Sequence, residues 1–427
     1  MKNRRNRGCG EFVNLSVERL GARGDGIAQY TGEPVFLPFT VPGDRVLARL
    51  GARRGPGREG QVVERLGSGL GCAMPPCRHF GRCGGCALQH LDPETYRGVK
   101  LGALHTALKR VGIDPSLVGP LQVVPPVRRR ARLGLVRPHD ASLAARIGFR
   151  ERFSHDLVDL EECPVLEPAL FAVVSRLRGV AHDLLPPDGT AEVTLTRTDS
   201  GIDMLLEAVE RPRLLALESL AAFGEECDLA RILWRTGAEE IVVVSRRPVR
   251  LVLSGVAVPF PPGAFLQASA ATEAILVESV LDGIGPRHPA LDLFAGLGAF
   301  TFALARGGSV HAIEGDARAA AALADAAAKH SGVTVERRDL ARDPLSPEAL
   351  GSYTAAVFDP PRAGAAHQAA ALAASTIETV IAVSCNPATF ARDAARLIGG
   401  GFRLESVTPV DQFVWTPHLE LVAVFRR

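Results

Sequence analysis

The strongest constraint on the fold is the stretch ALDLFAGLGAFTFALA, residues 290–305. An apolar strand breaks there at Gly296 and Gly298 and leads into a helix. From about residue 256 onward the order of strand, glycine-rich turn and helix repeats, which is typical of a parallel sheet covered by helices. We therefore predict an α/β fold with a doubly wound sheet over the last part of the chain.

The glycine loop predicts a nucleoside cofactor. Glycines let the backbone approach a ligand closely, and the start of the following helix offers N–H groups. The next strand, VHAI, leads to Glu314, about 20 residues after the loop, where a carboxylate can bind two ribose hydroxyls. A dinucleotide for hydride transfer and S-adenosylmethionine for methyl transfer are the two candidates. The dinucleotide pattern G-x-G-x-x-G/A does not fit Thr301 at its third position, which favours methyl transfer.

Two more carboxylates are expected at the same edge of the sheet. Asp339, in ERRDL, closes a third strand and is a candidate to face the adenine. Asp359, in AAVFDPPRAG, ends a fourth strand beside two prolines. A carboxylate at such a rigid strand end belongs to an active site more often than to a surface turn.

A cysteine follows the next strand, in VSCNPATF, residues 383–390. A free cysteine is most often buried in the core, where it packs as a small apolar residue. Cys385, however, is expected at the carboxyl edge of the sheet, where doubly wound folds have their binding and catalytic sites. A thiolate there can add to C6 of a pyrimidine, so that C5 attacks a sulfonium methyl group, and a base must then remove the C5 proton. Glu420 is the candidate base, and His418 is a weaker alternative.

The composition indicates a globular protein of several domains, with 427 residues of which 47% are hydrophobic and 22% charged. No uninterrupted apolar run has membrane-spanning length, so we expect a cytoplasmic protein without a membrane partner. Thiols stay reduced in the cytoplasm, so the eight cysteines are expected to serve metal binding or catalysis rather than disulfides.

Three cysteines lie close together in CRHFGRCGGC, at Cys77, Cys83 and Cys86. Cys163, in DLEECPVL, is the candidate fourth ligand because it is followed by proline, as the last ligand of some iron–sulfur sets is. Four thiolates also fit zinc, although the x5 gap is a poor match to the common zinc spacing. Iron–sulfur, zinc and no metal all remain open from spacing alone. The other unassigned cysteines are interpreted as structural or incidental: Cys9, Cys72 and Cys227.

The N-terminal region is basic and reads as a small β-barrel. Residues 1–150 hold 25 Lys and Arg against 11 Asp and Glu, whereas residues 151–427 hold 24 against 36. This asymmetry predicts that the front of the chain meets a polyanion, with a solvated charged surface as the alternative. Short strands with turn signals follow one another from about residue 11 to 66. Through GDGIA, VFLPFTVPGD and QVVERL this segment resembles a TRAM domain, a small RNA-binding barrel.

The ordered set DLFAGLGAFT, FDPPRAG, SCNP and PVDQFVWTPHLE, with CRHFGRCGGC and CPVL, resembles the RNA uracil-C5 methyltransferase family. The resemblance covers nearly the whole chain and is to the branch with a TRAM domain and an iron–sulfur cluster. It implies methyl transfer from S-adenosylmethionine to C5 of a uridine in structured RNA, with 23S rRNA preferred over tRNA. The expected domains are a TRAM-like barrel with a basic tail (1–67), a central α+β RNA-binding and iron–sulfur domain (68–255), and a Rossmann-like methyltransferase domain (256–427).

The resemblance also implies roles for single residues. Cys385 is the expected nucleophile and Glu420 the expected proton acceptor. The expected S-adenosylmethionine-site residues are Gln267, Phe294, Glu314, Asp339 and Asp359. The expected ligands of a [4Fe-4S] cluster are Cys77, Cys83, Cys86 and Cys163. Some positions depart from the family pattern without touching the nucleophile or base, and we expect them to bear on substrate choice: Val127, Ala268, Ser269, Ala299 and Val414.

Two other classes of function compete with RNA methylation. One is a non-catalytic RNA-binding protein that keeps a methyltransferase shell, and the presence of both Cys385 and Glu420 argues against it. The other is radical chemistry at the cluster, which predicts a C-x3-C-x2-C spacing that the x5 gap does not match. Nothing in the sequence implies a protein partner.

Overall fold

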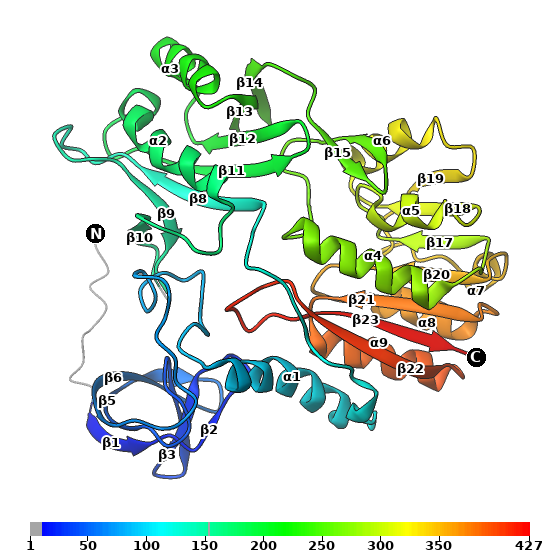
Figure 1. Ribbon diagram of the computed structural model, residues 1–427, viewed down its shortest axis with the longest axis horizontal. Helices are drawn as coiled ribbons and strands as arrows, with labels where there is room; N and C mark the ends of the chain where they lie inside the picture. The colour runs from blue at the N-terminus through cyan, green and yellow to red at the C-terminus, as the bar shows by residue number, and fades with distance from the viewer. Residues whose placement is uncertain (1–10, 153) are drawn as a thin grey trace. The chain divides into compact units, whose positions relative to one another are not determined.

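The computed structural model describes residues 11–152 and 154–427 (Figure 1). Contacts divide the chain into two compact units. The N-terminal unit comprises Met1–Ala103 with Trp415–Pro417, and the C-terminal unit comprises Leu104–Val414 with His418–Arg427. Cys9 lies outside the described residues.

A six-stranded sheet forms most of the N-terminal unit, in the strand order β1-β5-β6-β4-β3-β2. In β1 the apolar residues Val13 and Leu15 are buried while their neighbours are exposed, as the two-residue period of a strand requires. The strands are β1 (Phe12–Ser16), β2 (Arg19–Leu20), β3 (Gly26–Tyr30), β4 (Glu33–Leu37), β5 (Arg45–Arg54) and β6 (Gly57–Gly67). The expected succession of short strands is therefore present. Helix α1 (Pro93–Arg110) begins in this unit and ends in the other.

The C-terminal unit contains a seven-stranded mixed sheet in the order β10-β9-β8-β11-β12-β13-β14. Its apolar side packs against α2 and α3, through residues such as Leu177 of α2, Phe223 of α3 and Trp234 of β13. The strands are β8 (Arg130–Val136), β9 (Arg146–Arg150), β10 (Leu157–Asp159), β11 (Thr190–Thr198), β12 (Gly201–Ala208), β13 (Leu229–Thr236) and β14 (Glu239–Ser245). The helices are α2 (Pro168–Leu184) and α3 (Leu214–Glu226).

An eight-stranded sheet, in the order β19-β18-β17-β20-β21-β23-β22-β7, positions the candidate site in the same unit. Strands β17, β18, β19, β20 and β21 are parallel to one another, and β23 is antiparallel to both β21 and β22. The strands are β7 (Gln122–Val123), β17 (Ala290–Leu293), β18 (Val310–Glu314), β19 (Val333–Arg337), β20 (Ala355–Phe358), β21 (Thr379–Ser384), β22 (Arg403–Asp411) and β23 (Glu420–Arg426). The strand order reverses between β17 and β20, because β18 and β19 lie on one side of β17 and β20 lies on the other. Ligands bind at such a switch point in open α/β sheets.

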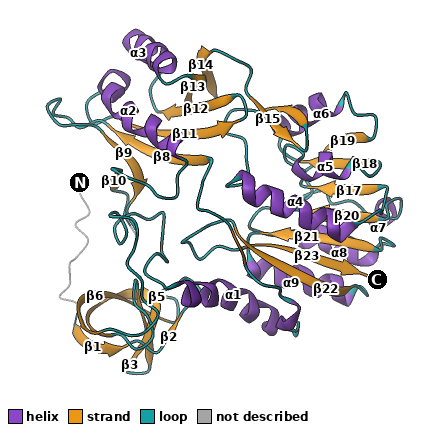
Figure 2. Ribbon diagram, viewed as in Figure 1, coloured by secondary structure: helices purple, strands orange, loops and turns teal. Residues whose placement is uncertain are grey.

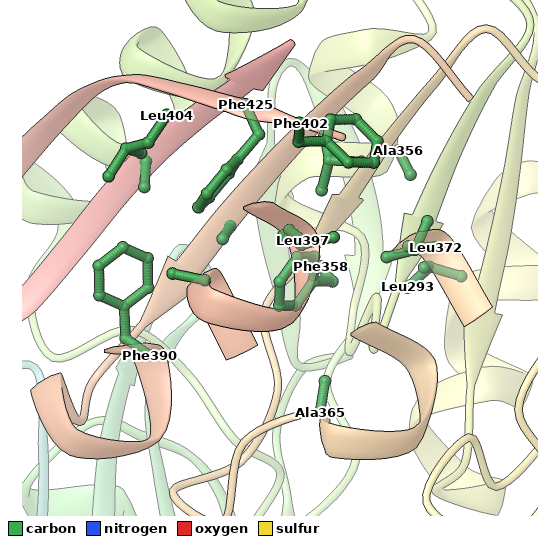
Figure 3. Close-up of a cluster of buried hydrophobic side chains, with 14 of the residues drawn as sticks. Leu293, Ala356, Phe358, Ala365, Leu372, Phe390, Leu397, Phe402, Leu404 and Phe425 are labelled. Carbon is green, nitrogen blue, oxygen red and sulfur yellow. The ribbon is translucent and has the colours of Figure 1, made fainter. Parts of the chain in front are cut away.

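Helices cover both faces of this sheet (Figure 2). Ala356 and Phe358 of β20 enter one apolar cluster, whereas Val357, between them, enters another with residues of α4 and α5. Figure 3 shows the first cluster, where Phe390 and Phe425 have ring centroids 6.4 Å apart. The helices are α4 (Ala270–Ile284), α5 (Ala299–Leu304), α6 (Ala317–Ala327), α7 (Pro347–Leu350), α8 (Ala366–Ala374) and α9 (Pro387–Gly399). The central strands are buried on both faces, which explains their uninterrupted apolar sequences.

Short elements connect the two sheets of this unit or extend them. A short hairpin of β15 (Arg250–Leu253) and β16 (Val256–Pro259) follows the seven-stranded sheet, and a 3₁₀ turn, η1 (Pro115–Leu117), follows α1. Strand β7, far earlier in the sequence, pairs in parallel with β22 and so extends the eight-stranded sheet, which the sequence did not predict. No helix in residues 11–152 or 154–427 is both long and apolar enough to span a membrane.

Candidate active site

The glycine loop joins β17 to α5 and has two distinct glycine positions. Gly296 has φ +57°, and a Cβ added there would meet no described atom within 4 Å. Gly298 has φ +94°, and a Cβ there would lie 2.5 Å from Cδ1 of Leu323. Gly296 therefore borders open space that a ligand can enter, whereas Gly298 lets α5 and α6 pack closely.

Glu314, the last residue of β18, holds the loop in place. Its Oε2 accepts a hydrogen bond from the Gly296 N–H at 2.7 Å, and its Oε1 accepts one from the Asp316 N–H at 2.7 Å. A carboxylate has lone pairs beyond these two bonds, so it can also accept from ribose hydroxyls. Phe294, with φ +63°, lies between β17 and this loop and is partly buried.

Two carboxyl groups lie on the neighbouring strands β17 and β20: Asp292 is fully buried within β17, and the partly buried Asp359 directly follows β20. Burial, with the nearby charge of Asp359, raises the pKa of Asp292 to about 7 although Thr301 Oγ1 donates to its Oδ2 at 2.5 Å. Its Oδ1 has no hydrogen-bond partner among the described residues. Burial likewise raises the pKa of Asp359 to about 7, and Gln267 Nε2 donates to Asp359 Oδ2 at 3.2 Å. The switch point thus carries acidic groups that suit a cationic sulfonium ligand.

Cys385 lies at the turn between β21 and α9. Ser384, the last residue of β21, is followed by Cys385 and then by Asn386, whose side chain accepts from the Ala388 N–H at 3.1 Å as the N-cap of α9. Pro387 occupies the first turn, where its missing N–H costs no helical hydrogen bond. The Asn-Pro pair therefore ends the strand and starts the helix, and the partly buried Cys385 stands between them.

The sheet register brings Cys385 and Glu420 together. Ser384, the last residue of β21, pairs with Leu421 of β23, so Cys385, directly after β21, and Glu420, the first residue of β23, both adjoin this pair. Burial, together with the carboxyl groups of Glu420 and Asp359, raises the pKa of the Cys385 thiol to about 11, while Arg362 opposes this shift. Burial and the Asp359 charge also raise the pKa of Glu420 well above its ordinary value.

Gln412, the residue after β22, connects Glu420 to Gln267. Its Nε2 donates to Glu420 Oε2 at 3.0 Å and to Gln267 Oε1 at 2.8 Å. Together with the bond from Gln267 to Asp359, these contacts form one buried chain of polar side chains from the glycine-loop side to the Cys385 side. The sequence analysis did not assign Gln412. Its only signal was its presence in the C-terminal motif PVDQFVWTPHLE.

Arg362, in the DPPR segment, is a second residue that the sequence analysis did not assign. Its backbone oxygen accepts from Asn386 Nδ2 at 3.0 Å, which ties the segment to the turn that carries Cys385. Its Nη2 lies 3.2 Å from Nδ1 of His418, and the His418 ring lies edge-on to Phe413 with centroids 6.0 Å apart. An exposed guanidinium at this position suits a phosphate or an enolate oxygen.

Asp339 lies apart from the hydrogen-bonded chain. It is the second residue after β19 rather than its last residue, and its exposed carboxylate accepts from the Ala341 N–H at 3.1 Å. Its Cα lies 3.5 Å from a Cβ built on Gly315, next to Glu314, so it stays near the predicted cofactor edge. Ser269 is the N-cap of α4, where its Oγ accepts from the Thr272 N–H at 3.1 Å, so this departure from the family pattern serves the helix.

The cysteine loop belongs to the N-terminal unit. Tight turns bring Cys77, Cys83 and Cys86 into one segment, with the Cys83 N–H donating to the backbone oxygen of His79 at 2.9 Å and the Gly85 N–H donating to Cys83 Sγ at 3.4 Å. Cys163 belongs to the C-terminal unit. In the described part of the chain no group of three or more His, Cys, Asp or Glu is placed to hold a metal ion. The iron–sulfur site therefore stays a prediction.

A glycine loop at the switch point, with the Glu314 carboxylate beside it and acidic groups on the adjoining strands, is the arrangement expected of an S-adenosylmethionine-dependent methyltransferase. In line with this, the fold matches the crystal structure of Pyrococcus abyssi tRNA (uracil-54, C5)-methyltransferase in complex with S-adenosyl-L-homocysteine, with a TM-score of 0.73, 24% identity, and coverage of 97% of this chain and 100% of that one. At this identity the match establishes the fold alone.

Sequence relatives identify the family. The profile of the tRNA (Uracil-5-)-methyltransferase family matches residues 255–427. An uncharacterized RNA methyltransferase of Caulobacter vibrioides is 41% identical over 97% of this chain and 100% of its own length. The 23S rRNA (uracil(1939)-C(5))-methyltransferase of Chromohalobacter salexigens is 37% identical over 97% of this chain and 89% of its own length. This chain belongs to the RNA uracil-C5 methyltransferase family, as the sequence motifs predicted, and it is an enzyme of methyl transfer to RNA.

Proposed function

We propose that this enzyme methylates C5 of a uridine in 23S rRNA, with Cys385 as nucleophile and Glu420 as proton acceptor. The observation that carries the proposal is that Cys385 and Glu420 adjoin the same residue pair of β21 and β23, where the charges of Glu420 and Asp359 act on the Cys385 thiol. The rRNA substrate is favoured over tRNA because a relative 37% identical over nearly the full chain is named for 23S rRNA.

The chemistry divides between the two residues. The Cys385 thiolate adds to C6 of the uracil, and the electrons of the C5=C6 bond move toward O4 as an enolate. When bound, S-adenosylmethionine would supply its methyl carbon to C5, and S-adenosylhomocysteine would leave with the electrons of the broken C–S bond. Glu420 accepts the proton from C5, and the electrons of that C–H bond restore C5=C6 as the thiolate leaves C6. The raised pKa of Glu420 makes it a stronger proton acceptor than an exposed carboxylate.

The methyl donor is assigned to the switch point. The residues that hold it in this proposal are Gln267, Phe294, Glu314, Asp339 and Asp359. Support comes from the open space at Gly296 and from the Glu314 carboxylate beside it. Asp359 is hydrogen-bonded to Gln267, and its charge acts on the Cys385 thiol. It is therefore on the side of the site where the sulfonium must approach the target uracil.

The target base must leave the folded RNA to reach Cys385, so the enzyme needs surfaces that hold the surrounding RNA. We assign this role to the six-stranded N-terminal sheet as a TRAM-like barrel, supported by the basic balance of residues 1–150. We further propose that Cys77, Cys83, Cys86 and Cys163 hold a structural [4Fe-4S] cluster. Support comes from the close sequence spacing of Cys77, Cys83 and Cys86 in one turn-rich segment and from the N–H that Gly85 donates to Cys83 Sγ.

The experiment for the substrate is methylation of unmodified 23S rRNA and of unmodified tRNA in separate reactions with S-adenosylmethionine, followed by mapping of the product by mass spectrometry. We expect 5-methyluridine in 23S rRNA, at the uridine equivalent to the one named for the Chromohalobacter relative. Methylation of tRNA alone would keep the chemistry and reject the rRNA assignment. Absence of product on both RNAs would reject the proposed function.

The cluster is tested separately by iron and acid-labile sulfide assays on anaerobically purified protein. Cys83→Ser is expected to lose iron and sulfide. Cys72→Ser is the matched control, because Cys72 is a nearby exposed cysteine outside the proposed ligand set. Equal iron in both variants, or none in the wild type, would contradict the ligand assignment.

A further inference from the structure

Gln412 is a buried amide whose polar atoms all lie within hydrogen-bond reach of a partner. It is 4% exposed. Its Oε1 accepts from the Ala268 N–H at 3.1 Å, and its Nε2 donates to Gln267 and Glu420. Thr272 Oγ1 also lies 3.0 Å from this oxygen, but its single proton is shared between Gln412 and the Ser269 backbone oxygen, which is likewise 3.0 Å away. Both N–H donors and one acceptor site of the amide are therefore paired. Such a residue has one preferred orientation.

The direction of these bonds is fixed by the backbone. A main-chain N–H can only donate, so the atom of Gln412 that faces Ala268 must be the oxygen. The nitrogen then faces Gln267 and Glu420, and both of its hydrogens are used. Gln267 must in turn present its oxygen to Gln412 and its nitrogen to Asp359.

This direction distinguishes the two oxygens of Glu420. Oε2 accepts the hydrogen bond from Gln412, whereas Oε1 is buried and has no partner among the described residues. Oε2 already accepts from the Gln412 amide, and Gln412 cannot rotate to free this oxygen without breaking its other hydrogen bonds. Oε1 is therefore the oxygen left to receive the proton from C5.

The amide itself is anchored by rigid elements. Thr272, in the first turn of α4, also bonds to the N-cap Ser269, with 2.9 Å between the two hydroxyl oxygens. Arg129 donates from Nε to the backbone oxygen of Gln267 at 3.0 Å and from Nη2 to Glu273 of α4 at 2.6 Å. The segment that carries Gln267 is thus held from both sides, and Gln412 is held against it.

We propose that Gln412 is a positioning residue for the methyl-transfer reaction, which holds Glu420 so that Oε1 faces the C5 proton and couples it through Gln267 to Asp359. The proposal rests on the proposed function, because it concerns the base of that reaction. It assigns to Gln412 the proton-removal step and neither cysteine addition nor binding of the methyl donor.

The test is Gln412→Met, which keeps the length of the side chain and removes the amide. Turnover on an unmodified 23S rRNA transcript is expected to fall roughly tenfold to a hundredfold, less than the full contribution of a general base. The methylated RNA should remain attached to Cys385, because addition and methyl transfer precede the slowed step. A denaturing gel shows this attachment as a protein–RNA adduct, which a purely structural defect would not increase.

Gln368→Met is the matched control. Gln368 is also fully buried, and its Oε1 accepts from the Leu345 N–H at 2.9 Å, away from the site. This variant is expected to lose stability without accumulating adduct. Gln412→Glu is the second variant, since it keeps acceptors for Ala268 and Thr272 but removes the donor to Glu420, and it should also accumulate adduct.

A 23S transcript containing 5-fluorouridine separates the two proposals. Fluorine at C5 cannot leave as a proton, so a working enzyme stays attached to this RNA regardless of the base. Wild type and Gln412→Met should form this adduct at similar rates. No adduct in the wild type would contradict the proposed function and the inference with it. The inference alone would be overturned if the wild type forms this adduct but both Gln412 variants turn over normally. It would also be overturned if the wild type forms the adduct and both variants turn over more slowly without accumulating methylated adduct.

Discussion

Glu314 Oε2 accepts a hydrogen bond from the backbone N–H of Gly296 at 2.7 Å, which joins the end of β18 to the glycine loop after β17. The second oxygen bonds the Asp316 N–H, so one carboxylate organises both loops beside the predicted donor site. Ribose hydroxyls added to such a group would make charge-assisted hydrogen bonds, each worth about 1.5–3 kcal/mol.

The first prediction concerns this carboxylate. Glu314→Gln offers one acceptor oxygen and no charge, so it cannot serve both loops and the ribose. We expect S-adenosylhomocysteine to bind about 10- to 100-fold more weakly by calorimetry. Glu336→Gln, on neighbouring β19 in a partly exposed ion pair with Arg338, is the control and should bind normally. Equal affinity of Glu314→Gln and wild type would remove Glu314 from the donor site.

The second prediction concerns the ionisation of Cys385. Its pKa is raised to about 11, so the thiolate fraction and the rate of alkylation by iodoacetamide should rise with pH up to about 11. Glu420→Gln removes a negative neighbour that raises this pKa, so the curve should move to lower pH. Mass spectrometry of the peptide that contains Cys385 follows the reaction. An unchanged curve in Glu420→Gln would show that the two side chains do not interact.

The elements that the sequence predicted best are those with strong local patterns. The apolar runs of β17, β20 and β21 and the glycine pair predicted a doubly wound sheet, and the parallel arrangement placed Asp359 and Cys385 at one edge. These inferences needed only the neighbours of each residue in the chain.

The parts that the sequence did not reveal depend on distant partners. Gln412 pairs with Gln267, 145 residues away, and nothing local marks either amide as half of a buried pair. The pairing of β7 with β22 has the same character, since two residues carry too little pattern to be called a strand. In the sequence, Asp292 is a single acidic residue within an apolar run. Its raised pKa follows from its complete burial, which only the structure reveals.

The third prediction concerns the pH dependence of stability. The pKa of Asp292 is raised to about 7 in the folded protein from an ordinary value near 3.8, so its neutral form is favoured by folding. Its contribution to stability is present below about pH 4 and is lost as pH rises to about 7, by at most roughly 4 kcal/mol. Asp292→Asn cannot ionise, so its stability relative to wild type should increase between pH 5 and 8 in chemical unfolding. Asp282→Asn, at an exposed position of α4, should show no such trend.

The last prediction contrasts the two glycines of the loop. Gly296→Ala places a methyl group in open space at φ +57°, so it should cost only about 1–2 kcal/mol of stability from backbone strain. That methyl group should nevertheless obstruct the donor and weaken its binding at least tenfold. Gly298→Ala brings the methyl group within 2.5 Å of Leu323, so overpacking adds to strain and the loss of stability should be about 2–5 kcal/mol.

Thermal unfolding and calorimetric titration with S-adenosylhomocysteine measure the two effects on the same samples. We expect Gly296→Ala to be more stable than Gly298→Ala. We also expect it to bind S-adenosylhomocysteine more weakly than the folded fraction of Gly298→Ala does. If Gly296→Ala binds as well as wild type, the open space beside Gly296 is not where the donor lies, and the contacts of Glu314 with this loop are then purely structural. If it binds poorly while remaining folded, the absence of a side chain at position 296 is required by the ligand rather than by the fold.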